Sequence, residues 1–250
     1  NEDSFDIEDF YTVDNPTYLA LDKEKNVLYS SMSKDDTQGV MSMNLDTGKV
    51  SEVLFKNEHT PAHISVLDDY LIASNYHDAH LDLYELSDHM VTKRLDSKTH
   101  TGEGPNKDRQ KQAHIHFALK NPHNNDILAC DLGSDRVHIY EIKDDTLNKK
   151  GEICVSPGSG PRHLCFSENE NITYVFSELT SEVFVLEYKN QKYHQMQYRE
   201  EQISAIGKEI ATMNLINPES LRGIIHNRLT LMHMGLIVVG LKGLTRKNLA

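Results

Sequence analysis

The sequence contains no tryptophan and only three cysteines among its 250 residues. Cys130, Cys154 and Cys165 are odd in number and lack the paired CxxC spacing of a zinc site or a redox motif. We therefore expect reduced thiols that pack as small hydrophobic side chains.

Positive charge is scarce as well. The chain has 26 lysines and arginines against 38 aspartates and glutamates, a formal net charge of −12, and no long basic cluster. A nucleic-acid surface needs cations that replace the counterions of phosphates, so this balance argues against a nucleic-acid partner. A small molecule or another protein is the expected partner.

Long apolar runs are also missing. The first ten residues, NEDSFDIEDF, are acidic and are not followed by an apolar segment, so they predict no signal peptide and a cytoplasmic location. The most apolar part of the sequence, residues 229–244, is interrupted by His233, Lys242 and three glycines. A membrane span requires about 20 mostly apolar residues, so we expect no membrane association.

What the sequence does contain is a repeat. Four stretches, beginning at NPTYLAL, TPAHISV, QAHIHFAL and GPRHLCF, each read as three short strands separated by polar turns. The third strands begin near Val40, Leu81, Val137 and Val183, which are 41, 56 and 46 residues apart, and polar segments such as GKVSEVLF can add a fourth strand. This period and strand count predict an all-β fold, a β-propeller with about four recognisable blades.

The character of the sequence changes at Gly207. Residues 207–250 contain six lysines or arginines, two glutamates and no aromatic residue, and they lack the strand and turn pattern. We therefore divide the chain into a partial propeller domain, 1–206, and an atypical tail, 207–250. The tail is expected to be a helical or partly disordered appendage, or a frameshifted or truncated end. Only a closed ring removes strand edges, so four blades leave edge strands unpaired, and these edges favour association of copies. We expect a monomer or a weak homo-oligomer.

Two histidines stand at the start of the third repeat, after the glycine-rich and basic segment TGEGPNKDRQKQ. His114 and His116 are two positions apart, so on a regular strand their side chains point to the same face. They are candidates for metal ligands, for a general base that activates water, or for structural hydrogen bonds inside a polar channel. Lys107 and Arg109 give the preceding loop its positive charge.

A second candidate group lies in the fourth repeat. In SPGSGPRHLCF the loop precedes Arg162, whose planar guanidinium suits a carboxylate, a phosphate or a developing oxyanion, although an arginine that only ties blades together is an equal alternative. The adjacent His163 should point to the opposite face of the strand. Glu178 follows the second strand of the same blade. Asp131, Asp135 and Arg136 in DLGSDRVHIY are interpreted as turn or inter-blade residues.

Taken together, GPNKDRQKQAHIH, DLGSDRVHIY, GPRHL and SELTSEV, in this order and spacing, resemble the lactonase family of seven-bladed β-propellers. The resemblance covers roughly residues 10–200. It implies hydrolysis of 6-phospho-D-glucono-1,5-lactone to 6-phosphogluconate, a step of the pentose phosphate pathway, without a metal or another cofactor.

The resemblance extends to the fungal carboxy-muconate lactonising enzymes and implies three catalytic residues: His114 as the base, with His116 as the alternative, Arg162 for the carbonyl oxygen, and Glu178 to orient Arg162 or the histidine. The substrate-binding candidates are His116, Arg109, Lys107 and His163, with Lys107 and Arg109 assigned to the phosphate. Seven blades are expected in the family, and about four are recognisable here, so an inactive propeller fragment that only binds is one alternative. A muconate-type cycloisomerase is the other.

Overall fold

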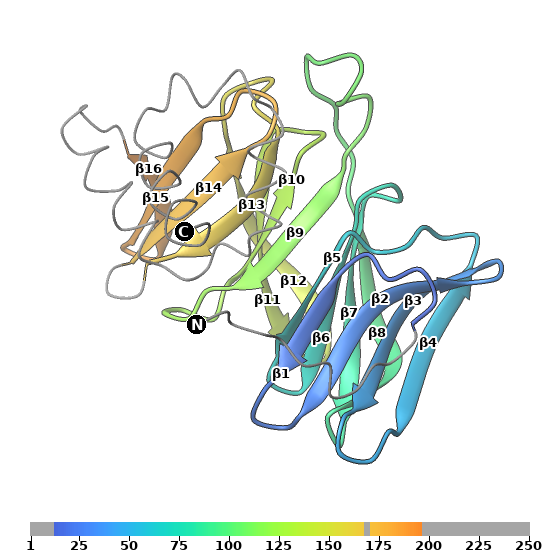
Figure 1. Cartoon of the computed structure of the whole chain (residues 1–250). Coiled ribbons are helices and arrows are strands. Elements are labelled where there is room, and N and C mark those ends of the chain that lie inside the picture. Colours follow the sequence, from blue (N-terminus) through green and yellow to red (C-terminus); the bar gives the residue numbers. More distant parts are fainter. Residues whose placement is uncertain (1–12, 168–170, 197–250) are drawn as a thin grey trace, which may run out of the picture.

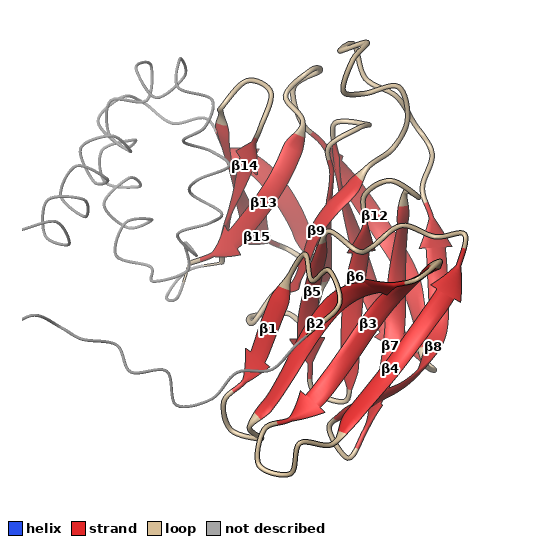
Figure 2. Cartoon of the chain, turned by 45° about the vertical axis from the view of Figure 1, so that its right-hand side comes forward, coloured by secondary structure: helices blue, strands red, loops and turns tan. Residues whose placement is uncertain are grey.

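The computed structural model describes residues 13–167 and 171–196, and every regular element in these ranges is a β-strand (Figures 1 and 2). The all-β prediction is therefore confirmed. The expectations for the tail, residues 207–250, lie outside the described residues. Within the described ranges there is no helix of the length and apolarity that a bilayer crossing would require.

Sixteen strands form four antiparallel sheets of four strands each. The first sheet contains β1 (Leu19–Asp22), β2 (Val27–Lys34), β3 (Thr37–Asn44) and β4 (Val50–Lys56). The second contains β5 (His63–Leu67), β6 (Tyr70–Asn75), β7 (His80–Ser87) and β8 (Met90–Thr99). The third contains β9 (Ile115–Lys120), β10 (Ile127–Asp131), β11 (Arg136–Lys143) and β12 (Thr146–Cys154). The fourth contains β13 (Pro161–Phe166), β14 (Ile172–Ser177), β15 (Val183–Lys189) and β16 (Lys192–Met196).

The four sheets are arranged as propeller blades. In each blade the strands pair in chain order. The first strands of successive blades are neighbours in space, so that β1 lies beside β5, β5 beside β9, and β9 beside β13 (Figure 2). Among the fourth strands, β8 of the second blade contacts both β4 of the first blade and β12 of the third. The predicted third-strand positions Val40, Leu81, Val137 and Val183 fall in β3, β7, β11 and β15, so the assignment of four blades is confirmed.

The outer hairpins close with tight turns that the sequence encodes locally. Between the third and fourth strands of the last three blades the loops have two residues, both with positive φ: Asp88 and His89, Asp144 and Asp145, Asn190 and Gln191. Two consecutive residues in this conformation make a type I′ turn, whose twist matches that of the flanking strands, and Asp and Asn tolerate it better than most residues.

The core lies between the blades. The second strands β10 and β14 are buried along their whole length, which agrees with their mostly apolar and small side chains. Each pair of neighbouring blades shares one apolar cluster, represented by Tyr29 with Tyr84, Leu83 with Ile127, and Val137 with Val175. This packing sets the spacing of the inner strands.

The three cysteines are free thiols, as the sequence predicts. Cys130 and Cys165 are buried, whereas Cys154, at the end of the outer strand β12, is exposed. The expectation of a packed thiol is therefore correct for two of the three.

Candidate functional site

A cavity of about 830 Å³ opens where the inner strands begin. Three segments from the first two blades form one side of it, and side chains from the third and fourth blades form the other. Its lining consists of Pro16, Thr17, Tyr18, Leu19, Thr60, Ala62, Tyr76, His77, Arg109, His116, Arg162, His163 and Glu178.

Four side chains form a continuous row on the side of the third and fourth blades. Glu178 is the centre: its Oε1 lies 2.6 Å from Nη1 of Arg109, and its Oε2 lies 3.0 Å from Nη1 of Arg162. Nε of Arg162 donates a hydrogen bond to Nε2 of His116 at 2.9 Å. We call Arg109, Glu178, Arg162 and His116 the charged row.

Two β-bulges produce this convergence. On β9, Ile115 and Phe117 pair with successive residues of β10, which leaves His116 as the extra residue. On β13, Pro161 and His163 pair with successive residues of β14, which leaves Arg162 as the extra residue. A bulge re-aims side chains and is common beside functional sites. Here it lets the two extra residues on neighbouring inner strands reach each other.

The bulge at Arg162 corrects one prediction. His163 was expected to point away from Arg162 because adjacent strand residues alternate, yet both side chains line the cavity. The pairing shift between Pro161 and His163 removes the alternation. The imidazole of His163 meets that of His116 edge to face, with ring centroids 5.0 Å apart.

His116 is held as a neutral imidazole. Because a guanidinium can only donate, the nitrogen that accepts from Arg162 is unprotonated and the proton lies on Nδ1, which is buried and has no hydrogen-bond partner. Burial lowers the pKa of His116 well below 6.5, and the neighbouring His163 and Arg162 lower it further. The ring therefore offers a lone pair, not a charge.

His114 does not line the cavity. It precedes β9, so the regular alternation that would place it on the same face as His116 does not apply, and the bulge interrupts the strand further. Its Nδ1 donates to the backbone oxygen of Tyr76 at 2.8 Å, and its ring stacks on Tyr76 with centroids 4.2 Å apart. The imidazole of His116 meets the same tyrosine ring edge to face, with centroids 5.7 Å apart, so a shared face for the two imidazoles stays a prediction.

The sequence missed Tyr76. A hydrogen bond with Tyr76 raises the pKa of the Arg109 guanidinium above its usual value. Partial burial lowers this pKa, but the contact with Glu178 raises it further. Tyr76 directly follows β6, the second strand of its blade, as Glu178 directly follows β14. Superposing the four repeats would have revealed that both residues occupy the same blade position. Lys107, in contrast, is exposed and does not line the cavity.

Several histidines inside the propeller share the neutral state of His116. Burial lowers the pKa of His100 to about 4 and that of His163 to about 3, helped by nearby His138 and Arg162 respectively. Burial also lowers the pKa of His63 well below 6.5. We refer to His63, His100, His116 and His163 as the buried imidazoles.

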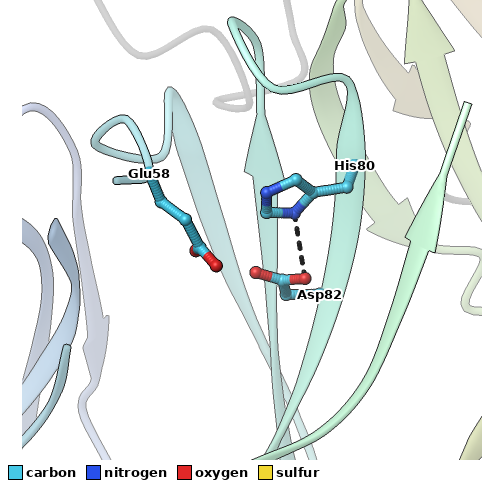
Figure 3. Close-up of side chains that lie close together, drawn as sticks. All are labelled: Glu58, His80 and Asp82. Carbon is cyan, nitrogen blue, oxygen red and sulfur yellow. Dashed lines mark hydrogen bonds and ion pairs between the residues drawn. The ribbon is translucent and has the colours of Figure 1, made fainter. Parts of the chain in front are cut away.

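Among the residues that the structure describes, one group has a metal-like geometry. Ligand atoms of Glu58, His80 and Asp82 lie within 4.8 Å of one another, and Figure 3 shows the three side chains facing each other. Arg94, however, already contacts both acids, with Nη1 at 2.9 Å from Glu58 and 3.1 Å from the fully buried Asp82. A metal ion would have to displace this guanidinium, so we interpret the group as a structural ion network.

Residues 5–213 match the family model described as "Lactonase, 7-bladed beta-propeller". The chain belongs to this lactonase family. Its relatives by sequence include 6-phosphogluconolactonase of Bacillus subtilis, 35% identical over 182 residues, and 6-phosphogluconolactonase of Formosa agariphila, 32% identical over 183 residues. These matches cover 70% and 68% of this chain and 52% of each relative, so the lactonase chain spans about half their length.

Solved structures agree with the lactonase fold. A protein from Lactobacillus plantarum superposes with a TM-score of 0.68 at 30% identity, and a putative 6-phosphogluconolactonase from Bacteroides fragilis with 0.65 at 26% identity. Both matches cover 74% of this chain and 56% of the other. The recognition of a lactonase-type propeller from the sequence is therefore confirmed.

Proposed function

We propose that this chain carries the site of a lactone hydrolase, a cytoplasmic 6-phosphogluconolactonase that needs no metal or other cofactor. The observation that carries the proposal is the charged row, which sets two guanidinium groups and an unprotonated imidazole nitrogen along one side of a cavity. The substrate, 6-phospho-D-glucono-1,5-lactone, is inferred from the names of the relatives in Bacillus subtilis and Formosa agariphila.

Arg162 is the proposed hydrogen-bond donor to the developing oxyanion. When water attacks the lactone carbonyl, negative charge gathers on the carbonyl oxygen, and a preorganised N–H donor stabilises that charge more than it stabilises the ground state. The ion pair between Glu178 and Nη1 orients Arg162 before substrate arrives, and this pair can persist when Nε releases His116. A donor that is already oriented spends no free energy on reorganisation during the reaction.

His116 is the proposed general base, in preference to His114, to which the family resemblance assigns that role. Only His116 lines the cavity, and its Nε2 lone pair becomes available to a water molecule once the carbonyl oxygen draws the N–H groups of Arg162. The lowered pKa keeps this nitrogen unprotonated at neutral pH. Negative charge on the adjacent oxyanion would raise the basicity of the ring during attack.

Arg109 is the proposed contact for the substrate phosphate, with Lys107 as an outer contributor. Arg109 shares Glu178 with Arg162, so the two guanidinium groups lie on either side of one carboxylate. A phosphosugar 1,5-lactone carries its phosphate and its carbonyl group on either side of the ring oxygen, two separate positions that match two separate cationic groups. Glu178 neutralises part of their charge and keeps both in place while the cavity is empty. His163, packed against His116, would complete the wall beside the sugar ring.

The proposed reaction balances as follows. A water oxygen bonds to C1 of the lactone while His116 takes one proton from it, and the tetrahedral oxyanion forms against Arg162. The bond between C1 and the ring oxygen then breaks, and the ring oxygen takes the proton from His116. The products are an open-chain carboxylic acid, which ionises and releases one proton to solvent, and the regenerated enzyme.

Proton release by the purified chain, measured at neutral pH with 6-phosphogluconolactone and corrected for spontaneous opening, tests this function. We expect acceleration that persists in EDTA. His116→Gln should reduce kcat by about 10²- to 10⁴-fold, the usual contribution of a general base, whereas His114→Gln should change it by less than a few fold. The reverse pattern would assign the base to His114.

Two other outcomes would replace the proposal. A folded chain that binds the phosphosugar but leaves the spontaneous rate unchanged would be a non-catalytic propeller. Lactone formation from a carboxy-muconate, without hydrolysis of phosphogluconolactone, would indicate a lactonising enzyme.

A further inference from the structure

Asp135 lies outside the cavity but is connected to the charged row. It occupies the turn between β10 and β11, where it has a positive φ of 56°, and only 6% of the residue is exposed. Its Oδ1 accepts hydrogen bonds from the backbone N–H of Gly160 at 2.8 Å and from Nε2 of Gln110 at 2.7 Å. Its Oδ2 accepts from the backbone N–H of Gly158 at 2.7 Å. One buried carboxylate therefore joins two loops.

The first of these loops leads to Arg162 and supports Glu178. Gly160 lies two residues before Arg162, and its carbonyl accepts the backbone N–H of Glu178 at 2.8 Å. The carbonyl of Ser159 accepts the next N–H, that of Leu179, at 3.0 Å. The segment that Asp135 fixes on one side thus holds the Glu178 backbone on the other.

The second loop leads to Arg109. Gln110, the next residue, is 1% exposed, and its side chain accepts from the backbone N–H of Asn106 at 3.1 Å and donates to the carbonyl of Leu132 at 2.9 Å. A Cβ atom added at Gly104 would lie 2.4 Å from the amide group of Gln110, so the loop closes tightly around this side chain. Arg109 therefore emerges from a segment whose position depends on the bond between Gln110 and Asp135.

We propose that Asp135 is a positioning residue that sets the spacing of the Arg109 and Arg162 guanidinium groups on either side of Glu178. This inference rests on the proposed function, because it states how the two ends of the phosphosugar lactone are matched. Asp135 itself touches no substrate. It acts through Gln110 for Arg109 and through the amides of Gly158 and Gly160 for Arg162.

The role requires a carboxylate. All three partners of Asp135 are N–H donors, and a carboxylate presents acceptor oxygens in both directions. Asparagine has nearly the same shape, but its NH₂ group must face at least one of these donors. Asp135→Asn therefore breaks one arm of the connection without creating a cavity.

The matched control is Asp126→Asn. Asp126 is 2% exposed and precedes β10, the strand that Asp135 follows after the turn, and it pairs with Lys150 at 2.5 Å. Both substitutions thus replace a buried carboxylate at an end of the same strand. We expect Asp135→Asn to lower kcat/KM for 6-phosphogluconolactone by about 10- to 100-fold, because small displacements of positioned groups are costly, and Asp126→Asn to keep it within about twofold.

A double-mutant cycle separates positioning from general loss of structure. If Asp135 acts through the two guanidinium groups, Asp135→Asn should reduce the residual kcat/KM of a protein that carries both Arg109→Ala and Arg162→Ala far less than it reduces that of the wild type. Equal losses in both backgrounds, or a wild-type kcat/KM for Asp135→Asn alone, would overturn the inference.

Amide hydrogen exchange keeps the test independent of activity. In Asp135→Asn the peptide covering residues 156–162 should exchange at least tenfold faster than in the wild type, while in Asp126→Asn it should not. An unchanged peptide would overturn the positioning role even in an active enzyme. If the wild type fails to hydrolyse the lactone, the proposed function fails first, and exchange at this peptide still decides whether Asp135 holds the loop.

Discussion

Removal of Arg162 gives the sharpest prediction of the proposed mechanism. Arg162→Ala takes away the hydrogen bond to His116 and the ion pair with Glu178. Glu178 is not left alone, because its other oxygen lies 2.6 Å from Arg109. His116 lines the cavity, so its Nε2 can accept from water there instead. We therefore expect the free energy of unfolding to fall by only about 1 kcal/mol, the net value of an ordinary hydrogen bond.

The effect on catalysis should be much larger. A single preorganised donor to a developing oxyanion contributes about 3 to 4 kcal/mol to the transition state, so kcat should fall by about 10²- to 10³-fold. Arg162→Lys should retain some activity, since it keeps the charge, but it cannot reach Glu178 and His116 at once with a planar fork. Initial rates of acid release, corrected for spontaneous ring opening, measure these changes, and urea unfolding measures stability.

Arg94→Ala is the matched control and should show the opposite pattern. Arg94 is paired with Glu58 and the fully buried Asp82, away from the cavity lining. Its loss leaves the buried Asp82 carboxylate to its contact with His80 at 3.0 Å and should cost up to about 3 to 5 kcal/mol of stability, with kcat of the folded protein unchanged. An Arg162→Ala protein with wild-type kcat would refute the assignment of the oxyanion contact.

Three further predictions concern specificity and stability. Arg109→Ala should raise KM for the phosphorylated lactone by about 10- to 100-fold, the value of a charged hydrogen bond, and leave that for unphosphorylated gluconolactone unchanged in parallel steady-state assays. Gly160→Ala should lower stability in urea unfolding by about 2 kcal/mol, since φ is +63° and its Cβ would lie 2.7 Å from Cγ of Leu179; Gly151→Ala, in open space, serves as the control. The buried imidazoles have lowered pKa values, so the unfolded chain binds more protons below about pH 6.5. Unfolding free energy should therefore decrease from pH 6.5 towards pH 4, by up to about 1.4 kcal/mol per pH unit for each imidazole, and a flat profile over this range would contradict their neutral state.

The blades were predictable because the sequence repeats their pattern. Positions such as Val137 and Val183 recur after the same succession of strand and turn, and apolar runs like DILACDL leave little choice for the buried second strands. The loops that enter the inner strands then indicate which polar residues approach the axis. On this basis Arg162 is a candidate, whereas the role of Glu178 comes from the family resemblance; both line the cavity.

The details of the site depended on features that alternation rules omit. A bulge shifts pairing by one residue and leaves no clear mark in the sequence, so the side-by-side placement of Arg162 and His163 was not predictable from a period of two. His114 lies just before β9 and His116 is the extra residue of the bulge, so a period of two does not relate these two residues either. Tyr76 was missed for another reason: it has no motif of its own, and only its blade position, shared with Glu178, distinguishes it.

The two bulges also separate the residues that pair the strands from the residues proposed for the chemistry. His116 and Arg162 are the residues that each inner strand carries in excess of its ladder, so neither is paired with a residue of the neighbouring strand. We therefore expect substitutions at these two positions to disturb strand pairing less than substitutions at paired positions. A protein engineer who wishes to replace the chemistry of the cavity would vary positions 116 and 162 first and leave the paired residues Ile115, Phe117 and Pro161 unchanged.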